Sequence, residues 1–562
     1  MNVATAVHKF FSSSAMLMVL VLANPWPTLA VQQGTQPSER PASLERQIAR
    51  AQQELGPLPE FRGQVAKFYT EVGDQPAWLD GVHLTPEGRE LIAQFESAAQ
   101  KGLRPQDYGD WQVMLKQLGA AKTEQQRFGV DVALTAAAMR YVSDLHFGRV
   151  SPQAVGFVLG TRARNFSVAD FLASKVVHAQ NVGQAIAEVE PKFAEYWRLL
   201  AVLDRYESLA AGGPKYKPLP VPKKSVHPGG TYAALPDLVA RLHRLDDLPL
   251  NATLPADRTK YEGAIVPAVE RFQQRHGLAV DGILGRATLT ALNVPLSHRI
   301  EQLEFALERW RWLPQHLTLP LIVVNIPEFR FYVLGRDYQW LMEQKVIVGR
   351  AYHHKTPVFI AQMQSVIFRP YWNVPYSIQR RELVPHIARD RGYLSRNRYE
   401  IVNRANRPVN ANASSPSVLA QLRRGALKIR QLPGVKNSLG LVKFEFPNRY
   451  DVYMHGTPAI ALFARTRRDL SHGCIRVEHP GELAAWVLRN VPAWTPEKIE
   501  AAMHGTETVT VTLPHPLTVV ILYGTAVVTH DAEVRFLTDI YGYDAKLKRT
   551  LAGPRKRITA GP

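Results

Sequence analysis

The chain has 562 residues, of which 46% are hydrophobic, and a formal net charge of +19. At about 150 residues per domain this length predicts three or four domains, and the composition is that of ordinary globular folds. The positive charge predicts attraction to anionic surfaces such as wall polymers, lipid headgroups or nucleic acid. A generally basic surface with no dedicated partner explains the charge equally well.

The N-terminus predicts export. Lys9 precedes an unbroken apolar run at 15–23 (AMLMVLVLA), and residues 28–30 (TLA) resemble a cleavage site, so we expect cleavage after Ala30. The run is shorter than the roughly 20 residues that span a bilayer, and no later segment is long and apolar enough. The mature chain is therefore expected to be soluble and extracytoplasmic, without a transmembrane span, which argues against nucleic acid as a partner. An uncleaved anchor is the alternative, because Lys9 alone is a weak basic region.

The next segments predict a lead-in at 31–60 and a helical domain at 61–211. Thr85 and Pro86 form an N-cap and first turn, and apolar residues follow at helical spacing. We interpret these apolar stripes as helix-packing core. Residues 212–230 are rich in proline and lysine, which predicts a semi-extended linker and not a packed element.

Residues 231–295 predict a compact helical module. Residues 268–278 (AVERFQQRHGL) indicate a helix with Gly277 at its C-cap, and residues 280–285 (VDGILG) indicate a turn before another helix. The pattern AV-x-x-FQ-x-x-x-GL-x-x-DG-x-x-G-x-x-T is present in full and resembles the small three-helix peptidoglycan-binding module. Read without that resemblance, Phe272 and Leu278 are only the core of a helical bundle.

The remaining chain changes from helical to β-rich. Residues 296–316 predict a connecting helix, in which Trp310 and Trp312 are expected to pack between domains. Residues 317–545 contain short β-rich runs with a few helical segments, typical of a mixed sheet or sandwich. An arginine-rich interruption at 376–440 is long enough to be a lid or a substrate-binding insert, or an insertion that touches nothing. Residues 546–562 form a basic tail.

Cys474 is the single cysteine. Exported proteins usually use cysteines in pairs, so a lone cysteine cannot form an internal disulfide and is either inert core or a nucleophile. A catalytic thiol needs a nearby base and a positive local field. His455, His472 and Arg476 lie close by in sequence, and the main chain around Gly473 offers amides for an oxyanion.

His455 followed by the segment 471–476 (SHGCIR) resembles the signature of the L,D-transpeptidases, the YkuD-type cysteine enzymes of peptidoglycan. The resemblance extends to further segments at 310–314 (WRWLP), 371–375 (YWNVP), 430–434 (RQLPG) with Asn437, and 539–542 (DIYG). It implies a multidomain α+β fold: a helical N-terminal scaffold, a small three-helix peptidoglycan-binding module, and a β-rich YkuD-type catalytic domain with an inserted lid.

The resemblance also implies roles for individual residues. Cys474 is expected to be the nucleophile and His455 the general base, later the acid, oriented by the main-chain carbonyl of Gly456. Many members of the large periplasmic branch carry Asp at the position of Gly456. If that carboxylate strengthens the histidine base in some members, this chain lacks the contribution. His472 and Gly473 are expected to contribute to the oxyanion pocket.

Three further residues are expected to contact the substrate or the cysteine loop. Arg476 is expected to stabilise that loop or a substrate carboxylate, and Trp372 and Tyr453 to line the substrate groove. For the two aromatic residues, ordinary core packing is an equally good explanation.

The implied reaction is a two-step acyl transfer in the periplasm. Cys474 attacks the third-position carbonyl of a tetrapeptide stem, releases D-alanine and forms a thioester, which the amine of a neighbouring stem resolves as a cross-link. The implied partners are peptidoglycan stem peptides as donor and acceptor, with other wall-synthesis enzymes as candidates, and no cofactor.

Several alternatives remain open at this stage. The acceptor can instead be a lipoprotein, a D-amino acid or water. A decayed, non-catalytic wall-binding scaffold is a second alternative. A zinc site using His455, His472, Cys474 and His479 is a third, although no second tight Cys/His pair accompanies them.

Overall fold

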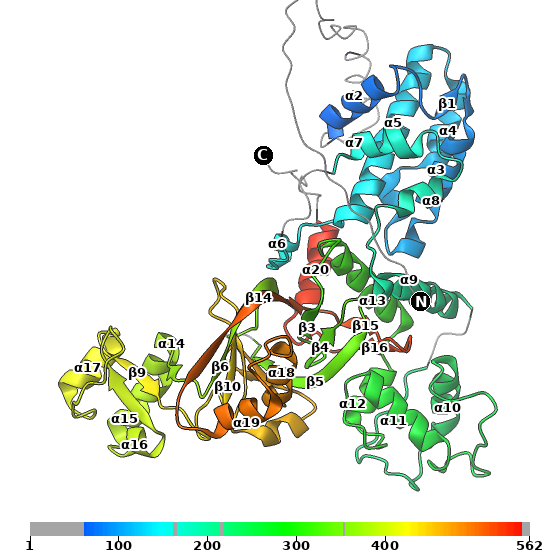
Figure 1. Cartoon of the computed structure of the whole chain (residues 1–562). Coiled ribbons are helices and arrows are strands. Elements are labelled where there is room, and N and C mark those ends of the chain that lie inside the picture. The colour runs from blue at the N-terminus through cyan, green and yellow to red at the C-terminus, as the bar shows by residue number, and fades with distance from the viewer. Residues whose placement is uncertain (1–45, 47–60, 161–165, 213–216, 352–353, 554–562) are drawn as a thin grey trace, which may run out of the picture.

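The computed structural model describes residue 46 and residues 61–160, 166–212, 217–351 and 354–553. The predicted signal segment, its cleavage site, nearly all of the lead-in and the end of the basic tail lie outside the described residues. No helix in the described ranges is long and apolar enough to cross a membrane. The architecture is multidomain α+β, as the sequence predicts (Figure 1).

The N-terminal domain is a helical bundle built around one long helix, α5 (Glu124–Phe147). Asp131 of α5 is fully buried and accepts hydrogen bonds from the Tyr69 hydroxyl at 2.6 Å and from the Trp78 N–H at 2.8 Å. The predicted cap is confirmed, because the Thr85 side chain accepts from the Gly88 N–H. The other elements of this region are α2 (Arg62–Glu71), β1 (Leu79–Asp80), β2 (His83–Leu84), α3 (Pro86–Glu96), α4 (Trp111–Ala120), α6 (Pro152–Val155), α7 (Val168–Phe171), α8 (Val182–Ala187) and α9 (Ala194–Ala211).

The peptidoglycan-binding-like module contains α10 (Leu235–Arg244), α11 (Ile265–Arg275) and α12 (Arg286–Leu292) around a small core. Gln273 organises the Asp-Gly turn, since its side-chain oxygen accepts from the N–H groups of Asp281 and Gly282. Gly282 has φ of 63°, a left-handed conformation that favours glycine. The predicted helix–turn–helix pattern is therefore present.

The proline-rich linker is more ordered than the sequence predicts. Leu219 is buried in the module core, and its N–H and C=O exchange hydrogen bonds with the Asn293 side chain. Val226 forms a β-bridge with Leu284. The expectation that the whole of 212–230 is unpacked is wrong for Leu219 and Val226, which pack on the module, whereas Val221 between them is exposed.

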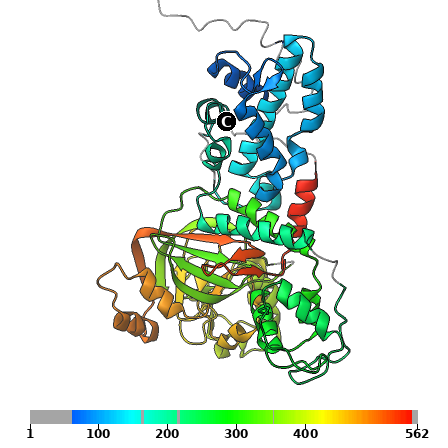
Figure 2. The same cartoon turned by 90° about the vertical axis from the view of Figure 1, so that its right-hand side faces the viewer.

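The catalytic-like domain is a curved nine-stranded sheet with strand order β12-β5-β13-β11-β10-β6-β14-β3-β4, in which β4 also pairs with β5. The sheet therefore closes on itself, and its curvature is visible in Figure 2. The strands are β3 (Leu321–Asn325), β4 (Arg330–Leu334), β5 (Trp340–Gly349), β6 (Phe359–Phe368), β10 (Val442–Glu445), β11 (Met454–His455), β12 (Asp469–Ser471), β13 (Ile475–Val477) and β14 (Val509–Leu522). A separate hairpin joins β15 (Ala526–Val528) and β16 (Val534–Phe536), and the helices around the sheet are α18 (Pro480–Val487), α19 (Pro496–His504) and α20 (Tyr543–Ala552).

The interruption at 376–440 folds as a subdomain with its own apolar core. Its sheet has the strand order β7-β9-β8. Strand β7 precedes the predicted start of the insert in sequence and pairs with β9 inside the insert. Its elements are β7 (Trp372–Asn373), α14 (Tyr376–Ile378), the π-helical turn η5 (Gln379–Leu383), α15 (Val384–Arg389), α16 (Tyr393–Arg396), β8 (Tyr399–Val402), α17 (Pro416–Arg424) and β9 (Lys428–Gln431). Figure 1 shows this insert projecting from the side of the closed sheet.

Helices α9 and α13 (Leu296–Arg311) belong to the core of the sheet, whereas α2 to α5, α7 and α8 form a separate core. Helix α13 packs along α9, and the Val158 N–H donates to the Val358 carbonyl at 2.9 Å. Trp310 contacts the Phe193 ring and Trp312 contacts the Phe157 ring, so both tryptophans pack between domains, as the sequence predicts. The domains are therefore joined by apolar packing around α9 and α13.

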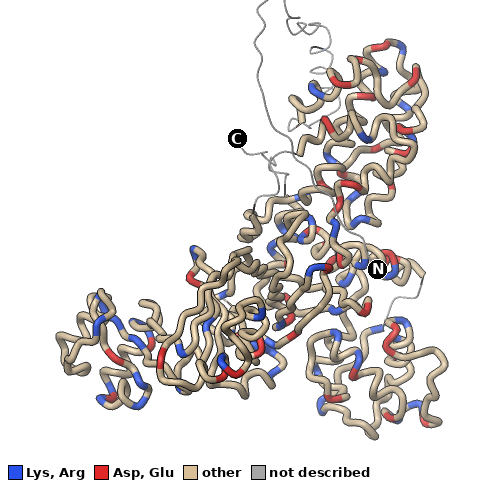
Figure 3. The backbone as a smooth tube through the Cα atoms, viewed as in Figure 1, with Lys and Arg blue, Asp and Glu red and all other residues tan. Residues whose placement is uncertain are grey.

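Charged residues of both signs occur in every described domain (Figure 3). This distribution favours a generally basic surface over a single dedicated site for an anionic partner.

We predict that Trp312→Ala lowers the free energy of unfolding by about 3–5 kcal/mol, because it empties a fully packed interdomain position. Trp312 is 3% exposed, whereas Trp197 on α9 is 40% exposed and serves as the control. Denaturant unfolding of Trp197→Ala should show a much smaller loss. An equal loss in both variants would show that the interdomain packing is not the source of the stability.

Candidate active site

Two short parallel strands bring the candidate thiol and imidazole together. In the pairing of β11 with β13, Met454 lies opposite Ile475 and His455 lies opposite Arg476. The Ile475 N–H donates to the Tyr453 carbonyl at 3.0 Å, which places Cys474 beside Tyr453, at the start of β13. Because side chains alternate along a strand, His455, Arg476 and Cys474 share one face of the sheet.

The imidazole of His455 is buried and held in one orientation. Its Nδ1 lies 2.5 Å from the Gly456 carbonyl oxygen, and the Gly456 N–H donates to the Val442 carbonyl at 2.9 Å. A carbonyl only accepts, so Nδ1 carries the proton and Nε2 keeps its lone pair. Burial, with the nearby charge of Arg476, lowers the pKa of His455 to about 3. The ring is therefore neutral near pH 7 and able to accept a proton.

Cys474 is half-buried, and its sulfur is in a hydrogen-bonded environment. The thiol donates to the Asp451 carbonyl, with Sγ 3.7 Å from the oxygen. Burial raises the pKa of Cys474, while hydrogen bonds from the Tyr453 N–H and hydroxyl, together with the charges of Lys443 and Arg476, oppose the rise. The resting group is consequently a thiol near pH 7.

Asp451 belongs to the turn that joins the antiparallel strands β10 and β11. Its φ is 52°, a left-handed conformation in which an aspartate is tolerated. The side-chain oxygen of Asn448 accepts from the N–H groups of Tyr450 and Val452, which fixes the turn. An Asn two residues before the residue it caps is a recognisable Asx-turn signal, so the turn itself was predictable, but its contact with the thiol was not.

The main chain of the cysteine loop, residues 471–474, is fixed by side chains. The Ser471 hydroxyl donates to the Cys474 carbonyl at 2.6 Å and accepts from the Gly473 N–H at 3.1 Å. The Gly473 carbonyl accepts from the Thr356 hydroxyl at 2.8 Å, and Gly473 has φ of 121°. The Gly473 N–H is therefore bonded to Ser471 in this structure. Among the described residues none accepts a hydrogen bond from the Cys474 N–H.

The loop rests on a second set of residues at the end of β5. A Cβ added at Gly349 would lie 3.0 Å from the Gly473 Cα and 1.8 Å from the His354 carbonyl oxygen, so only glycine fits there. The Tyr541 hydroxyl donates to the Gly349 carbonyl at 2.5 Å and accepts from the Thr356 N–H at 3.2 Å. Tyr541 lies in the 539–542 segment, which the sequence analysis noted only through resemblance.

Trp372 and Tyr453 form a chain of hydrogen bonds that ends at the sulfur of Cys474. Trp372 hydrogen-bonds the Tyr453 side chain, and the Tyr453 hydroxyl in turn hydrogen-bonds Cys474. Burial, together with the Cys474 charge, raises the pKa of Tyr453, so its hydroxyl stays protonated. Lys443 lies 4.5 Å from the centre of the Tyr453 ring. Both aromatic residues therefore lie beside the candidate nucleophile.

Arg476 and His472 differ in their surroundings: Arg476 is partly buried, and His472 contacts the insert. Burial, with the charge of Arg350, lowers the pKa of Arg476, and the buried Nε of Arg476 has no hydrogen-bond partner among the described residues. The His472 side chain instead reaches the insert, where its Nε2 lies 2.7 Å from Glu382 Oε1. Glu382 is a residue that the sequence analysis missed, because no local pattern links positions this far apart.

The described residues contain no group of three or more His, Cys, Asp or Glu side chains placed to hold a metal ion. His479 is the N-cap residue of α18, and its N–H donates to the Gln344 side chain.

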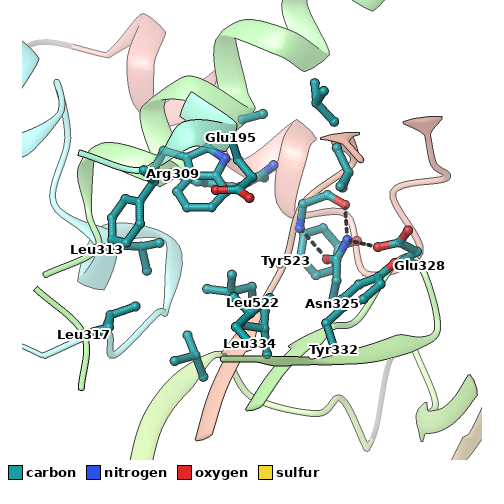
Figure 4. Close-up of a pocket in the computed structure, with 18 of the residues that line it drawn as sticks. Glu195, Arg309, Leu313, Leu317, Asn325, Glu328, Tyr332, Leu334, Leu522 and Tyr523 are labelled. Carbon is teal, nitrogen blue, oxygen red and sulfur yellow. Dashed lines mark hydrogen bonds between the residues drawn. The ribbon is translucent and has the colours of Figure 1, made fainter. Parts of the chain in front are cut away.

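An apolar cavity of about 120 Å³ lies between α9, α13 and the strands β3, β4 and β14 (Figure 4), and no residue of the cysteine loop lines it. Its polar rim includes Asn325, which hydrogen-bonds Glu328 and the Gly524 main chain. None of the predicted site residues lines this cavity. It belongs to the interdomain packing.

Three family profiles match the chain in order. Residues 63–203 match a scaffold domain, residues 233–292 match a domain described as "Putative peptidoglycan binding domain", and residues 320–521 match the YkuD L,D-transpeptidase catalytic domain. The last range contains the cysteine loop, His455 and the insert.

A curated relative and a solved structure are also similar. A protein of Haemophilus influenzae described as "Putative L,D-transpeptidase" is 31% identical over 227 residues, which cover 40% of this chain and 45% of the relative. The matched region thus spans less than half of that relative. The crystal structure of the L,D-transpeptidase (residues 123–326) from Xylanimonas cellulosilytica matches with 15% identity and a TM-score of 0.16, covering 54% of this chain and all of that one.

The residues from β3 to β14 thus carry His455 on β11 and Cys474 directly before the paired strand β13, within the range of the matched profile. The chain contains an L,D-transpeptidase catalytic domain of the YkuD family, preceded by a peptidoglycan-binding domain and a helical scaffold domain.

Proposed function

We propose that this protein cross-links peptidoglycan by joining third-position residues of two stem peptides through a thioester on Cys474. The observation that carries the proposal is the pairing of β11 with β13, which sets the thiol and a neutral imidazole on one face of adjacent strands. The peptidoglycan-binding domain supports peptidoglycan as the substrate. We place the protein in the periplasm, consistent with the predicted signal segment.

In the first step, His455 Nε2 takes the thiol proton as sulfur attacks the third-position carbonyl. The hydrogen bond from Nδ1 to the Gly456 carbonyl holds the ring while it becomes positively charged. This backbone carbonyl performs the orienting role, so Gly456 in place of the acidic residue of other members leaves the base functional. The proton then passes to the departing D-alanine amine, and the thioester remains.

The tetrahedral intermediate needs hydrogen-bond donors near the sulfur. The Cys474 N–H is the best-placed main-chain donor, because the Gly473 N–H already bonds Ser471. The Tyr453 hydroxyl is a second donor, since it already reaches the sulfur and stays protonated. We therefore assign oxyanion stabilisation to Cys474 N–H and Tyr453 instead of Gly473.

In the second step, the amine of a neighbouring stem attacks the thioester, and His455 accepts its proton. The product is an amide between two third-position residues, and the thiol is restored. The same acyl-enzyme can pass its acyl group to a lipoprotein amine, a D-amino acid or water, and the site geometry does not favour any of these acceptors over a stem.

We predict that wild-type protein incubated with tetrapeptide muropeptides yields dimers and a covalent adduct at Cys474, both visible by mass spectrometry. Cys474→Ala should form neither, because the sulfur that carries the acyl group is gone. Cross-linking by Cys474→Ala would overturn the proposal. Hydrolysed stems from the wild type, without dimers, would assign the acceptor to water.

His455→Asn should slow acylation of Cys474 by about 10²–10⁴-fold, because the general base is lost while the side chain keeps a similar shape. Stopped-flow or quenched intact-mass kinetics measure this rate. His504 lies exposed on α19, and His504→Asn should acylate at the wild-type rate. Equal rates for the His455 variant and wild type would assign the base to another group.

The lowered pKa of His455 predicts an unusual pH profile. A histidine with a pKa near its ordinary value loses its basic form as pH falls below about 6.5. With a pKa of about 3, the His455 base persists at much lower pH. Acylation should therefore show no histidine-type decline between about pH 7 and pH 5, and should rise only at alkaline pH, because burial raises the pKa of the Cys474 thiol. A decline with a midpoint near pH 6.5 would contradict this electrostatic description.

A further inference from the structure

The insert contacts the cysteine loop through one hydrogen bond between a carboxylate and an imidazole. His472 Nε2 lies 2.7 Å from Glu382 Oε1, and the two side chains are 27% and 45% exposed. Glu382 belongs to η5 in the insert, while His472 lies two residues before Cys474 in the loop. The hydrogen bond therefore joins the insert directly to the segment that presents the candidate nucleophile.

The turn that carries Glu382 is anchored in the insert, while the Glu382 side chain itself is exposed. In the same π-helical turn, the buried Gln379 donates to the Leu422 and Leu427 carbonyls at 2.8 and 3.0 Å and accepts from the Ile429 N–H at 2.8 Å. Leu383, the next residue, is buried in the insert core. π-helical turns frequently occur at functional sites. The position of Glu382 is therefore set by the insert as a whole.

On the other side of the contact, the backbone of the cysteine loop is fixed to the closed sheet. The hydroxyls of Ser471 and Thr356 bind the carbonyls of Cys474 and Gly473. The His354 ring lies 4.9 Å from the His472 ring in an edge-on arrangement. The side chain of His472 is thus the part of this loop that turns toward the insert.

A second contact links the base of the insert to the sulfur. Trp372 of β7 hydrogen-bonds Tyr453, which hydrogen-bonds Cys474. The insert therefore meets the site at Trp372 and at Glu382. A change in the position of the insert alters both sets of contacts around the nucleophile.

We propose that Glu382 is a positioning residue that latches the insert over the cysteine loop, and that its bond to His472 couples closure over a bound stem peptide to the geometry at Cys474. This inference rests on the proposed transpeptidase function. A half-exposed carboxylate–imidazole contact is individually weak, so the latch opens readily to admit a stem and closes again around it. A carboxylate on Nε2 also fixes the orientation and tautomer of the His472 ring.

The test compares Glu382→Ala, Glu382→Gln and the control Arg381→Ala in the full chain. Arg381 is exposed in the same turn, so its loss tests the turn without the latch. One measurement is the rate of Cys474 acylation by a tetrapeptide stem as a function of stem concentration. The other is hydrogen–deuterium exchange of the peptide that covers 376–389 in the free protein, which requires no activity.

Glu382→Ala should raise the stem concentration at half-maximal acylation by about fivefold, the factor that a half-exposed polar contact of this kind supports. The same variant should exchange faster at 376–389 and keep the wild-type melting temperature. Glu382→Gln retains an acceptor oxygen, so its concentration dependence and its exchange at 376–389 should lie close to those of wild type. Arg381→Ala should match wild type in both measurements. Wild-type exchange and wild-type concentration dependence in Glu382→Ala would overturn the latch, and so would an equal change in Arg381→Ala.

The two proposals fail separately. Absence of any adduct on the wild type refutes the transpeptidase function, and the exchange measurement still decides whether Glu382 holds the insert in place. An adduct on every variant, with unchanged concentration dependence and exchange, refutes only the latch.

Discussion

The parallel pairing of β11 with β13 is the interaction on which the site depends. These strands are short, and they are held between β10 and β5 in a sheet that closes on itself. The register sets His455 opposite Arg476 and leaves Cys474 at the strand start, beside Tyr453. A slip of one residue would turn one of the two groups to the other face. The sheet therefore determines whether thiol and imidazole meet.

The electrostatics of the site follow from burial more than from charge pairing. Burial lowers the pKa of His455 and raises that of Cys474, so both groups favour their neutral forms. Lys443 and Arg476 provide positive charge near the sulfur, which favours the thiolate once the proton leaves. This arrangement differs from a preformed thiolate–imidazolium pair. It makes proton transfer part of the attack on the carbonyl.

Local patterns predicted much of the architecture. The cap at Thr85, the Asp-Gly turn of the module and the interdomain packing of Trp310 and Trp312 each depend on neighbouring residues, and the structure contains them. The linker was predicted poorly, since the partner of Leu219 is Asn293, far along the chain. The sheet of the insert was missed because β7 is only two residues long.

For the site, the motif indicated which residue types to examine but not how they are connected. Cys474 and His455 were identified by resemblance, whereas the contacts of Asp451, Thr356, Tyr541 and Glu382 come from distant segments. The occupied Gly473 N–H illustrates the limit: glycine indicates backbone freedom, but its hydrogen-bond partner is a matter of tertiary geometry. Such contacts have no periodicity in the sequence.

The central claim is that a neutral imidazole with its proton on Nδ1 lies beside a neutral thiol. Nitrogen NMR of histidine-labelled protein tests it most directly, with His455→Asn used to assign the signal. The account predicts that His455 remains a neutral Nδ1–H ring from pH 8 to pH 5. An imidazolium signal at pH 6, or a neutral ring with its proton on Nε2, would contradict it.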